Sequence, residues 1–153
     1  MTTHPISGSL HSVEGVGSVR VEDHFDTDID DLWSAVTERD RLARWIAVVS
    51  GDLRLGGEFH ARFTSGWDGP GRVDVCEPPR RLVLTMRPGC SDETVIEATL
   101  SPDGTRTRFM VEERNLPTPE LAAHGAGWQA HVEDLKSTLA VANRPAGGTG
   151  GSS

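Results

Sequence analysis

The segment from Pro117 to Val141 constrains the fold of this chain most, because its apolar residues recur at intervals of three and four. The recurring residues are Leu121, His124, Trp128, Val132, Leu135 and Leu139. This spacing predicts a long amphipathic helix with one apolar face. Short alternating segments precede it from about Gly57 to Asn115, and they predict antiparallel hairpin strands. We expect the helix to cross the concave side of this sheet and to enclose a cavity where a function would be located.

The elements before the helix are separated by glycine- and proline-rich breaks. Strands are expected at about 8–11, 18–25, 58–64, 71–76, 81–87, 94–101 and 107–114, with a strand and glycine turn at 52–57. Asp28 is expected to cap a first short helix, and Leu42, Trp45 and Ile46 predict a second one. The order of elements predicts an α+β fold, with helices on one side of an antiparallel sheet.

Length and charge limit the classes of function. With 153 residues and a formal net charge of −8, the chain is expected to form one domain, 8–142, between a flexible tail, 1–7, and a disordered Gly/Ser-rich tail, 143–153. No basic stripe is present, which disfavours a nucleic acid or an anionic membrane as partner. No apolar stretch reaches the roughly 18 residues of a membrane helix, and no signal peptide is visible, so a cytoplasmic location is expected. Richness in Arg, Gly and Ala without Tyr suggests a bacterial source.

Four motifs, in sequence order, resemble those of bacterial proteins related to the C-terminal domain of the activator of the Hsp90 ATPase. The motifs are DDLWSAVTERDRLARW, GDLRLGGEFHARF, GRVDVCEPPRRLVLT and HGAGWQAHVEDL. The resemblance implies the helix-grip fold of the START-like or Bet v 1-like (SRPBCC) superfamily. In that fold a curved antiparallel sheet wraps around a long C-terminal helix, with two short helices after the first main strand.

The resemblance implies a fold more firmly than a function. Helix-grip proteins include lipid carriers, hormone receptors, and polyketide cyclases and aromatases. The eukaryotic activator also has a separate N-terminal domain for which this chain has no room, so co-chaperone activity is not carried over. Glu113 stands where relatives often carry histidine or another polar residue near the mouth of the pocket.

Asp23, Glu113 and His131 are the candidates for proton transfer. Strand alternation places both acids on the enclosed side, and the helix-grip topology makes their strands neighbours, so the two carboxyl groups are expected close together. An apolar cavity would raise the pKa of such a carboxyl group, which could then act as an acid or a base. The alternative is that both acids lie at frayed strand ends or pair with arginine.

Side chains of the sheet and the last helix are expected to line the cavity. These residues are Trp45, Phe59, Phe63, Trp67, Leu84, Met86, Ile96, Phe109, Glu113, His124, Trp128 and His131. Trp128 has the alternative of a core residue, with Gly127 allowing close approach to the sheet. His124 and His131 share a helix face, or else flank the apolar stripe as partly exposed residues. Trp67 is interpreted as a lid, a self-association contact or a loop anchor.

Three hypotheses for function follow in order. The first is binding of a small, largely apolar molecule without transformation, because the expected lining has few polar groups. The second is a cyclase- or dehydratase-like enzyme, although no catalytic motif is recognised. The third is an interaction module like the activator domain, with an apolar patch around Trp67. No metal or cofactor is expected, and the sequence does not decide between a monomer and a homodimer.

Overall fold

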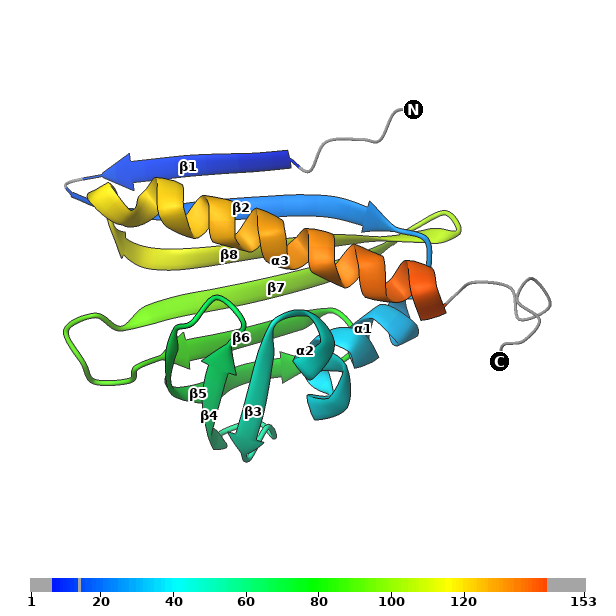
Figure 1. Cartoon of the computed structure of the whole chain (residues 1–153), viewed down its shortest axis with the longest axis horizontal. Helices are drawn as coiled ribbons and strands as arrows, with labels where there is room; N and C mark the ends of the chain where they lie inside the picture. Colours follow the sequence, from blue (N-terminus) through cyan, green and yellow to red (C-terminus); the bar gives the residue numbers. More distant parts are fainter. Residues whose placement is uncertain (1–6, 14, 143–153) are drawn as a thin grey trace.

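The sheet and one long helix dominate the computed structural model, which describes residues 7–13 and 15–142 (Figure 1). The tails expected at 1–7 and 143–153 lie outside the described residues, apart from Ser7. The elements are β1 (Ser7–Val13), β2 (Val16–Phe25), α1 (Ile29–Thr37), α2 (Arg39–Trp45), β3 (Ala47–Gly51), β4 (Glu58–Phe63), β5 (Asp68–Glu77), β6 (Arg81–Met86), β7 (Thr94–Asp103), β8 (Arg106–Pro117), the 3-10 helix η1 (Thr118–Glu120) and α3 (Leu121–Ala142).

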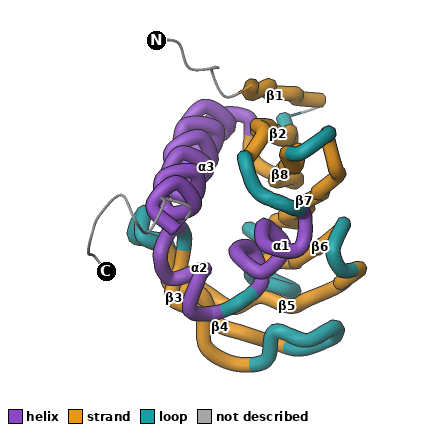
Figure 2. The backbone as a smooth tube through the Cα atoms, turned by 90° about the vertical axis from the view of Figure 1, so that its right-hand side faces the viewer, coloured by secondary structure: helices purple, strands orange, loops and turns teal. Residues whose placement is uncertain are grey.

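All eight strands form one antiparallel sheet in the order β1-β2-β8-β7-β6-β5-β4-β3. The chain runs as a meander from β3 to β8, and β8 then pairs with β2. The sheet curves around α3, which lies across its concave side (Figure 2). The predicted helix-grip fold is thereby confirmed, including the neighbouring first and last main strands.

The helix α3 buries the apolar face that its spacing predicts. Leu121, Trp128, Val132, Leu135 and Leu139 are at most 7% exposed. Gly125 packs close to the sheet, because a Cβ atom there would lie 3.2 Å from Leu10 Cδ2. The prediction that Gly127 serves this purpose is wrong, since a Cβ atom at Gly127 would meet nothing within 4 Å.

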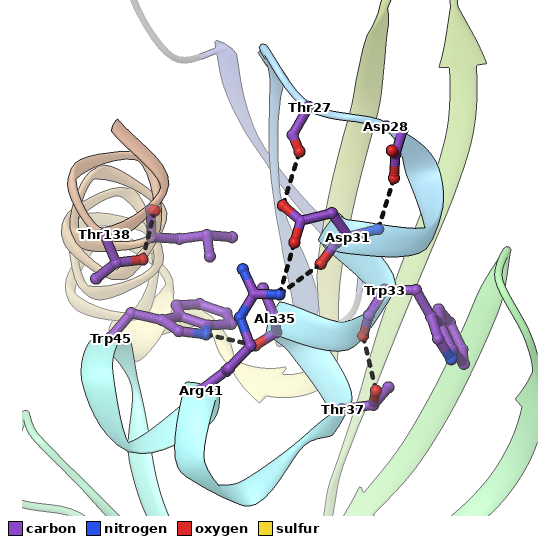
Figure 3. Close-up of polar contacts among 10 residues, drawn as sticks. Thr27, Asp28, Asp31, Trp33, Ala35, Thr37, Arg41, Trp45 and Thr138 are labelled. Atoms are coloured by element: carbon purple, nitrogen blue, oxygen red, sulfur yellow. Dashed lines mark hydrogen bonds and ion pairs between the residues drawn. The ribbon is translucent and has the colours of Figure 1, made fainter. Parts of the chain in front are cut away.

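The short helices α1 and α2 are fastened to each other by side-chain hydrogen bonds (Figure 3). Asp28 caps α1 as predicted, with its carboxylate accepting from Asp31 N at 2.8 Å. Arg41 Nη1 donates to Asp31 Oδ1 at 2.8 Å, and Trp45 Nε1 donates to the Ala35 carbonyl at 2.9 Å. Trp45 is 4% exposed and belongs to the core.

Three boundaries differ from the sequence-based expectation. A strand, β3, follows α2 directly at Ala47–Gly51, where the sequence suggested a strand starting only near Asp52. The strand β5 begins at Asp68, inside a segment expected to be a loop. The strand β8 continues to Pro117 through Asn115, whose φ is 68°, because this residue takes up a left-handed conformation that keeps the strand paired with β2.

Candidate functional site

The two halves of α3 pack differently against the sheet. Beneath its C-terminal half the space is filled, since the rings of Phe25 and Phe109 meet edge to face with centroids 5.9 Å apart. Beneath its N-terminal half the structure contains a cavity of about 370 Å³. A volume of this size is at the lower end of the range for small-molecule sites, roughly 300–1,000 Å³.

Aromatic and aliphatic side chains make up most of the cavity wall. The lining residues are Phe63, Ser65, Trp67, Met86, Asp92, Thr94, Ile96, Glu113, Leu116, Pro117, Glu120, Ala123, His124, Gly127, Trp128 and His131. They come from β4, β6, β7, β8, η1, the loops around Trp67 and Asp92, and the first half of α3. Among the polar lining residues, Thr94, Glu113 and His124 form one hydrogen-bonded group where β7 and β8 face α3.

Glu113 is the centre of that polar group and is only 7% exposed. Its Oε1 atom accepts a hydrogen bond from Trp128 Nε1 at 2.9 Å and lies 3.1 Å from His124 Nδ1. Its Oε2 atom accepts from the Thr94 hydroxyl at 2.9 Å. The carboxylate is thus fixed between two strands and the helix.

These contacts set the charges of Glu113 and His124. Burial raises the pKa of Glu113, but the hydrogen bonds from His124, Trp128 and Thr94 outweigh it and hold the pKa below its ordinary value. The hydrogen bond to Glu113 holds the pKa of His124 above its ordinary value despite partial burial. The predicted raised pKa of Glu113 is therefore wrong, because its donors stabilise the charged form.

His131 lies two turns further along α3 than His124 and has a different environment. It is 7% exposed, and its ring lies between those of Trp128 and Phe63, with centroids 5.8 and 6.0 Å away. Burial lowers the pKa of His131, and the backbone of Trp45 opposes this only in part. Among the described residues no atom hydrogen-bonds its buried Nδ1 atom. The imidazole of His131 thus forms part of the cavity wall, while its Nδ1 atom is buried.

Trp67 forms the outer wall and is held from two sides. Its ring meets that of Phe63 edge to face at 5.3 Å, and the Arg87 guanidinium lies 4.8 Å from its centroid. Arg87 Nη2 also donates to the Asp68 carbonyl at 3.0 Å. These contacts anchor the loop while leaving one face of Trp67 towards the cavity.

Most of the predicted lining residues do surround one cavity. Those that line it are Phe63, Trp67, Met86, Ile96, Glu113, His124, Trp128 and His131. Trp45, Phe59, Leu84 and Phe109 do not line it. Trp45, Phe59 and Phe109 belong to the buried core, and Leu84 packs against it.

Asp23 and Glu113 share the inner face but are not close together. Asp23 lies opposite Phe109, whereas Glu113 lies opposite Val19, four residues away along the same strand pair. At about 3.3 Å per residue this separates the two positions by roughly 13 Å. Asp23 instead accepts a hydrogen bond from Lys136 Nζ at 2.6 Å, so the predicted carboxyl pair is wrong.

Several lining residues were not identified from the sequence. Thr94 lies two residues before Ile96 on β7, so strand alternation places both side chains on the same, inner face. This pattern could have identified Thr94 from the sequence. The others lie where periodicity gives no indication of the facing side: Ser65 and Asp92 in loops, Leu116 and Pro117 at the end of β8, Glu120 in η1 and Ala123 at the start of α3. Gly127 has the clearest sequence signal, because a glycine inside a helix indicates either close packing against a neighbour or a need for space beside the helix.

The described residues contain no group of three or more His, Cys, Asp or Glu side chains that could hold a metal ion. No helix in the described part of the chain is long and apolar enough to cross a membrane.

The large apolar side chains that are most exposed in 7–13 and 15–142 include Leu10, Val13 and Val16 in the β1–β2 hairpin. Trp67 is not among them, so the apolar patch expected around it is not found.

The two cavity histidines give stability opposite dependences on pH. The raised pKa of His124 provides stability that is complete below pH 6.5 and is lost as the pH rises through the folded-state pKa. The lowered pKa of His131 provides stability that is present above pH 6.5 and is lost as the pH falls through its folded-state pKa. We therefore expect the free energy of unfolding to be greatest near pH 6.5.

Urea unfolding between pH 5 and pH 9 measures this dependence. His124→Gln should flatten the alkaline side of the profile, and His131→Gln should flatten the acid side above pH 5. An alkaline decline of unchanged slope in His124→Gln would show that the Glu113–His124 pair does not control it.

Comparisons with known proteins agree with the fold. The crystal structure of CalU16 from Micromonospora echinospora is 27% identical, with a TM-score of 0.72 over 85% of this chain and 82% of that one. DynU16, a protein in the dynemicin biosynthetic locus, is 29% identical, with a TM-score of 0.73 over 80% of this chain. The match spans only 46% of DynU16.

A third structure supports the fold alone. Protein MLL2253 from Mesorhizobium loti is 22% identical, with a TM-score of 0.74 over 83% of this chain and 99% of that one. A comparison with curated protein sequences gave no match. The family model of activator of Hsp90 ATPase homolog 1-like proteins matches residues 26–140, which include α1 to α3 and nearly all of the cavity wall. The chain therefore belongs to the activator of Hsp90 ATPase homolog 1-like family.

Proposed function

We propose that the protein binds a small, largely apolar molecule in the cavity between α3 and the sheet. The observation that carries this proposal is the cavity of about 370 Å³, whose walls are mainly aromatic and aliphatic. Burial of apolar ligand surface against such walls contributes about 25 cal/mol per Å² before the costs of association. Membership of a family with the helix-grip fold, and likeness to CalU16 and DynU16, are consistent with a ligand-binding or polyketide-related role.

The polar group in the cavity favours binding over catalysis. Glu113 already accepts hydrogen bonds from Trp128 and Thr94 and is paired with His124. A carboxylate with a lowered pKa is a weak base and, at neutral pH, carries no proton to donate. In this proposal Glu113 holds the cavity wall together, because it accepts hydrogen bonds from Thr94 on β7 and Trp128 on α3.

The binding of N-phenyl-1-naphthylamine tests the proposal, because this neutral dye becomes strongly fluorescent in an apolar cavity. Gly127 lines the cavity, and a side chain added there would project into open space. We expect the wild-type protein to bind the dye saturably, and Gly127→Leu to weaken binding at least tenfold because leucine fills the cavity. Leucine is a better helix former than glycine by up to about 1 kcal/mol, so the variant should fold at least as well.

Ala126→Leu is the matched control, since it adds the same side chain at the adjacent, exposed position of α3. This variant should bind the dye as the wild-type protein does. Equal binding by Gly127→Leu and Ala126→Leu would place the dye elsewhere on the surface and would contradict the proposal.

His131 supports a second candidate function, a cyclase- or dehydratase-like enzyme. His131 lines the cavity, and burial lowers its pKa, so its neutral imidazole could accept a proton from a bound molecule. Native mass spectrometry of freshly purified protein, with extraction of any bound molecule, distinguishes the two functions. A molecule recovered unchanged after incubation supports binding alone, and its conversion by the wild-type protein but not by His131→Gln supports the enzyme.

A further inference from the structure

We propose that Arg87 controls how fast a ligand enters and leaves the cavity, because it joins two parts of the rim that must separate to widen the entrance. This inference rests on the proposed function and assigns a positioning residue to the same cavity. Arg87 does not itself line the cavity, but it contacts two residues that do, Trp67 and Asp92.

The entrance of the cavity is defined by its exposed lining residues. These residues are Ser65, Asp92, Pro117, Glu120 and Ala123, whereas the rest of the lining is buried or half-buried. Ser65 and Asp92 lie in the loops 64–67 and 87–93, and the other three lie where β8 leads through η1 into α3. The buried face of α3 fixes this second group, so the two loops are the parts of the rim that can move.

Both loops contain a glycine that suits movement. Gly66 and Gly89 have φ angles of 103° and 80°, and a Cβ atom at either position would meet nothing within 4 Å. Space around the backbone and the conformational freedom of glycine let both loops change shape. Contacts elsewhere in the loops must therefore hold the rim in the observed position.

The side chain of Arg87 reaches from the loop 87–93 to the loop 64–67. Its guanidinium carbon lies 4.8 Å from the centre of the Trp67 ring, and its Nη2 atom donates to the Asp68 carbonyl at 3.0 Å. The Trp67 ring also packs on Phe63, with centroids 5.3 Å apart, and on the backbone at Gly69, where a Cβ atom would lie 2.9 Å from the ring. Of these three contacts of the ring, the one with Arg87 comes from the other loop.

Asp92 holds the guanidinium of Arg87 beside the Trp67 ring. Its Oδ2 atom lies 3.4 Å from Arg87 Nε, which is buried and forms no hydrogen bond within the described residues. An ion pair of this kind and a single cation–π contact are each weak in a partly exposed place. Thermal motion therefore breaks them often enough for a ligand to pass, and their strength sets how often this happens.

Stopped-flow fluorescence with N-phenyl-1-naphthylamine tests the inference. We expect Arg87→Ala to raise the association and the dissociation rate constants about tenfold each, which corresponds to about 1.4 kcal/mol of lost contact energy. The dissociation constant, which is the ratio of the two, should change less than about threefold because Arg87 does not line the cavity. The dye is neutral, so removing the arginine charge does not alter its attraction to the protein.

Asp92→Asn is a second variant, at a side chain that is 62% exposed and so tolerates the change. It should raise both rate constants about threefold, and it should add little to Arg87→Ala because both changes break the same contact. Arg72→Ala is the matched control, since Arg72 donates to Asp74 at 2.7 Å in the same sheet and neither residue lines the cavity. This variant should keep the wild-type rate constants, and far-UV circular dichroism checks that all variants are folded.

The outcomes separate the two proposals. Unchanged rate constants in Arg87→Ala, or equal increases in Arg72→Ala, overturn the inference and leave the cavity intact as a binding site. Weaker binding with an unchanged association rate constant means that Arg87 only supports the wall, and it also overturns the inference. Fully additive effects of Arg87→Ala and Asp92→Asn overturn the shared contact. If the wild-type protein does not bind the dye saturably, both the proposed function and the inference fail.

Discussion

Trp128→Ala should lower the free energy of unfolding by about 3–5 kcal/mol, the range for removing a large buried aromatic side chain. Trp128 is 7% exposed, packs edge to face on His131 and donates its indole N–H to Glu113. Alanine removes the packing, leaves Glu113 with one donor fewer and opens the cavity towards the core. Urea unfolding at pH 7, monitored by far-UV circular dichroism, measures the change.

Trp128→Phe separates packing from hydrogen bonding at this position. Phenylalanine keeps most of the apolar area and loses only the N–H donor to Glu113, so its expected effect is about 1–3 kcal/mol, as for a lost hydrogen bond to a charged group. A loss in Trp128→Ala no larger than that in Trp128→Phe would mean that the ring does not support α3, contrary to this structure.

Glu113→Leu should have the second-largest effect, a loss of about 3 kcal/mol of unfolding free energy. Leucine is apolar and of similar size, but it leaves the Trp128 N–H and the Thr94 hydroxyl without their acceptor. It also removes the counter-charge of His124, whose side chain is 34% exposed and can rehydrate. This places the expected loss at the lower end of the range for a broken buried pair.

The pKa of His124 provides an independent measurement of the same change. In Glu113→Leu this pKa should fall towards its ordinary value of 6.5, because its largest cause, the hydrogen bond to Glu113, is gone. Proton NMR titration of the His124 ring follows it. Glu113→Gln is the control, since its amide oxygen still accepts a hydrogen bond, and we expect it to lose about 1–2 kcal/mol. An unchanged pKa of His124 in Glu113→Leu would argue against the pair.

The fold was predictable from sequence because its signals are local and repeat many times. The three- and four-residue spacing of apolar residues from Leu121 to Leu139 places them on one face of a helix. This face is buried in the structure. Asp28 was identifiable as a helix cap for the same reason, since a cap depends on three or four consecutive residues. The motifs shared with the family add the order in which these elements pack.

The cavity was predictable only in outline. Strand alternation places Glu113 and Ile96 on the inner face, and the register confirms that they lie opposite each other. Alternation does not say where along a strand the helix lies close and where it leaves space. Phe109 and Glu113 share a face of β8, yet one is packed against Phe25 and the other lines the cavity.

The sequence by itself determined the helix-grip architecture, the buried face of α3 and the presence of acids and histidines on the enclosed side. The tertiary structure alone decided their partners: Asp23 with Lys136, Glu113 with Trp128 and His124, and a free nitrogen on His131. Periodicity fixes the direction of a side chain relative to its own backbone. Distances between elements depend on register, sheet curvature and the crossing of α3, which arise only when the whole chain packs.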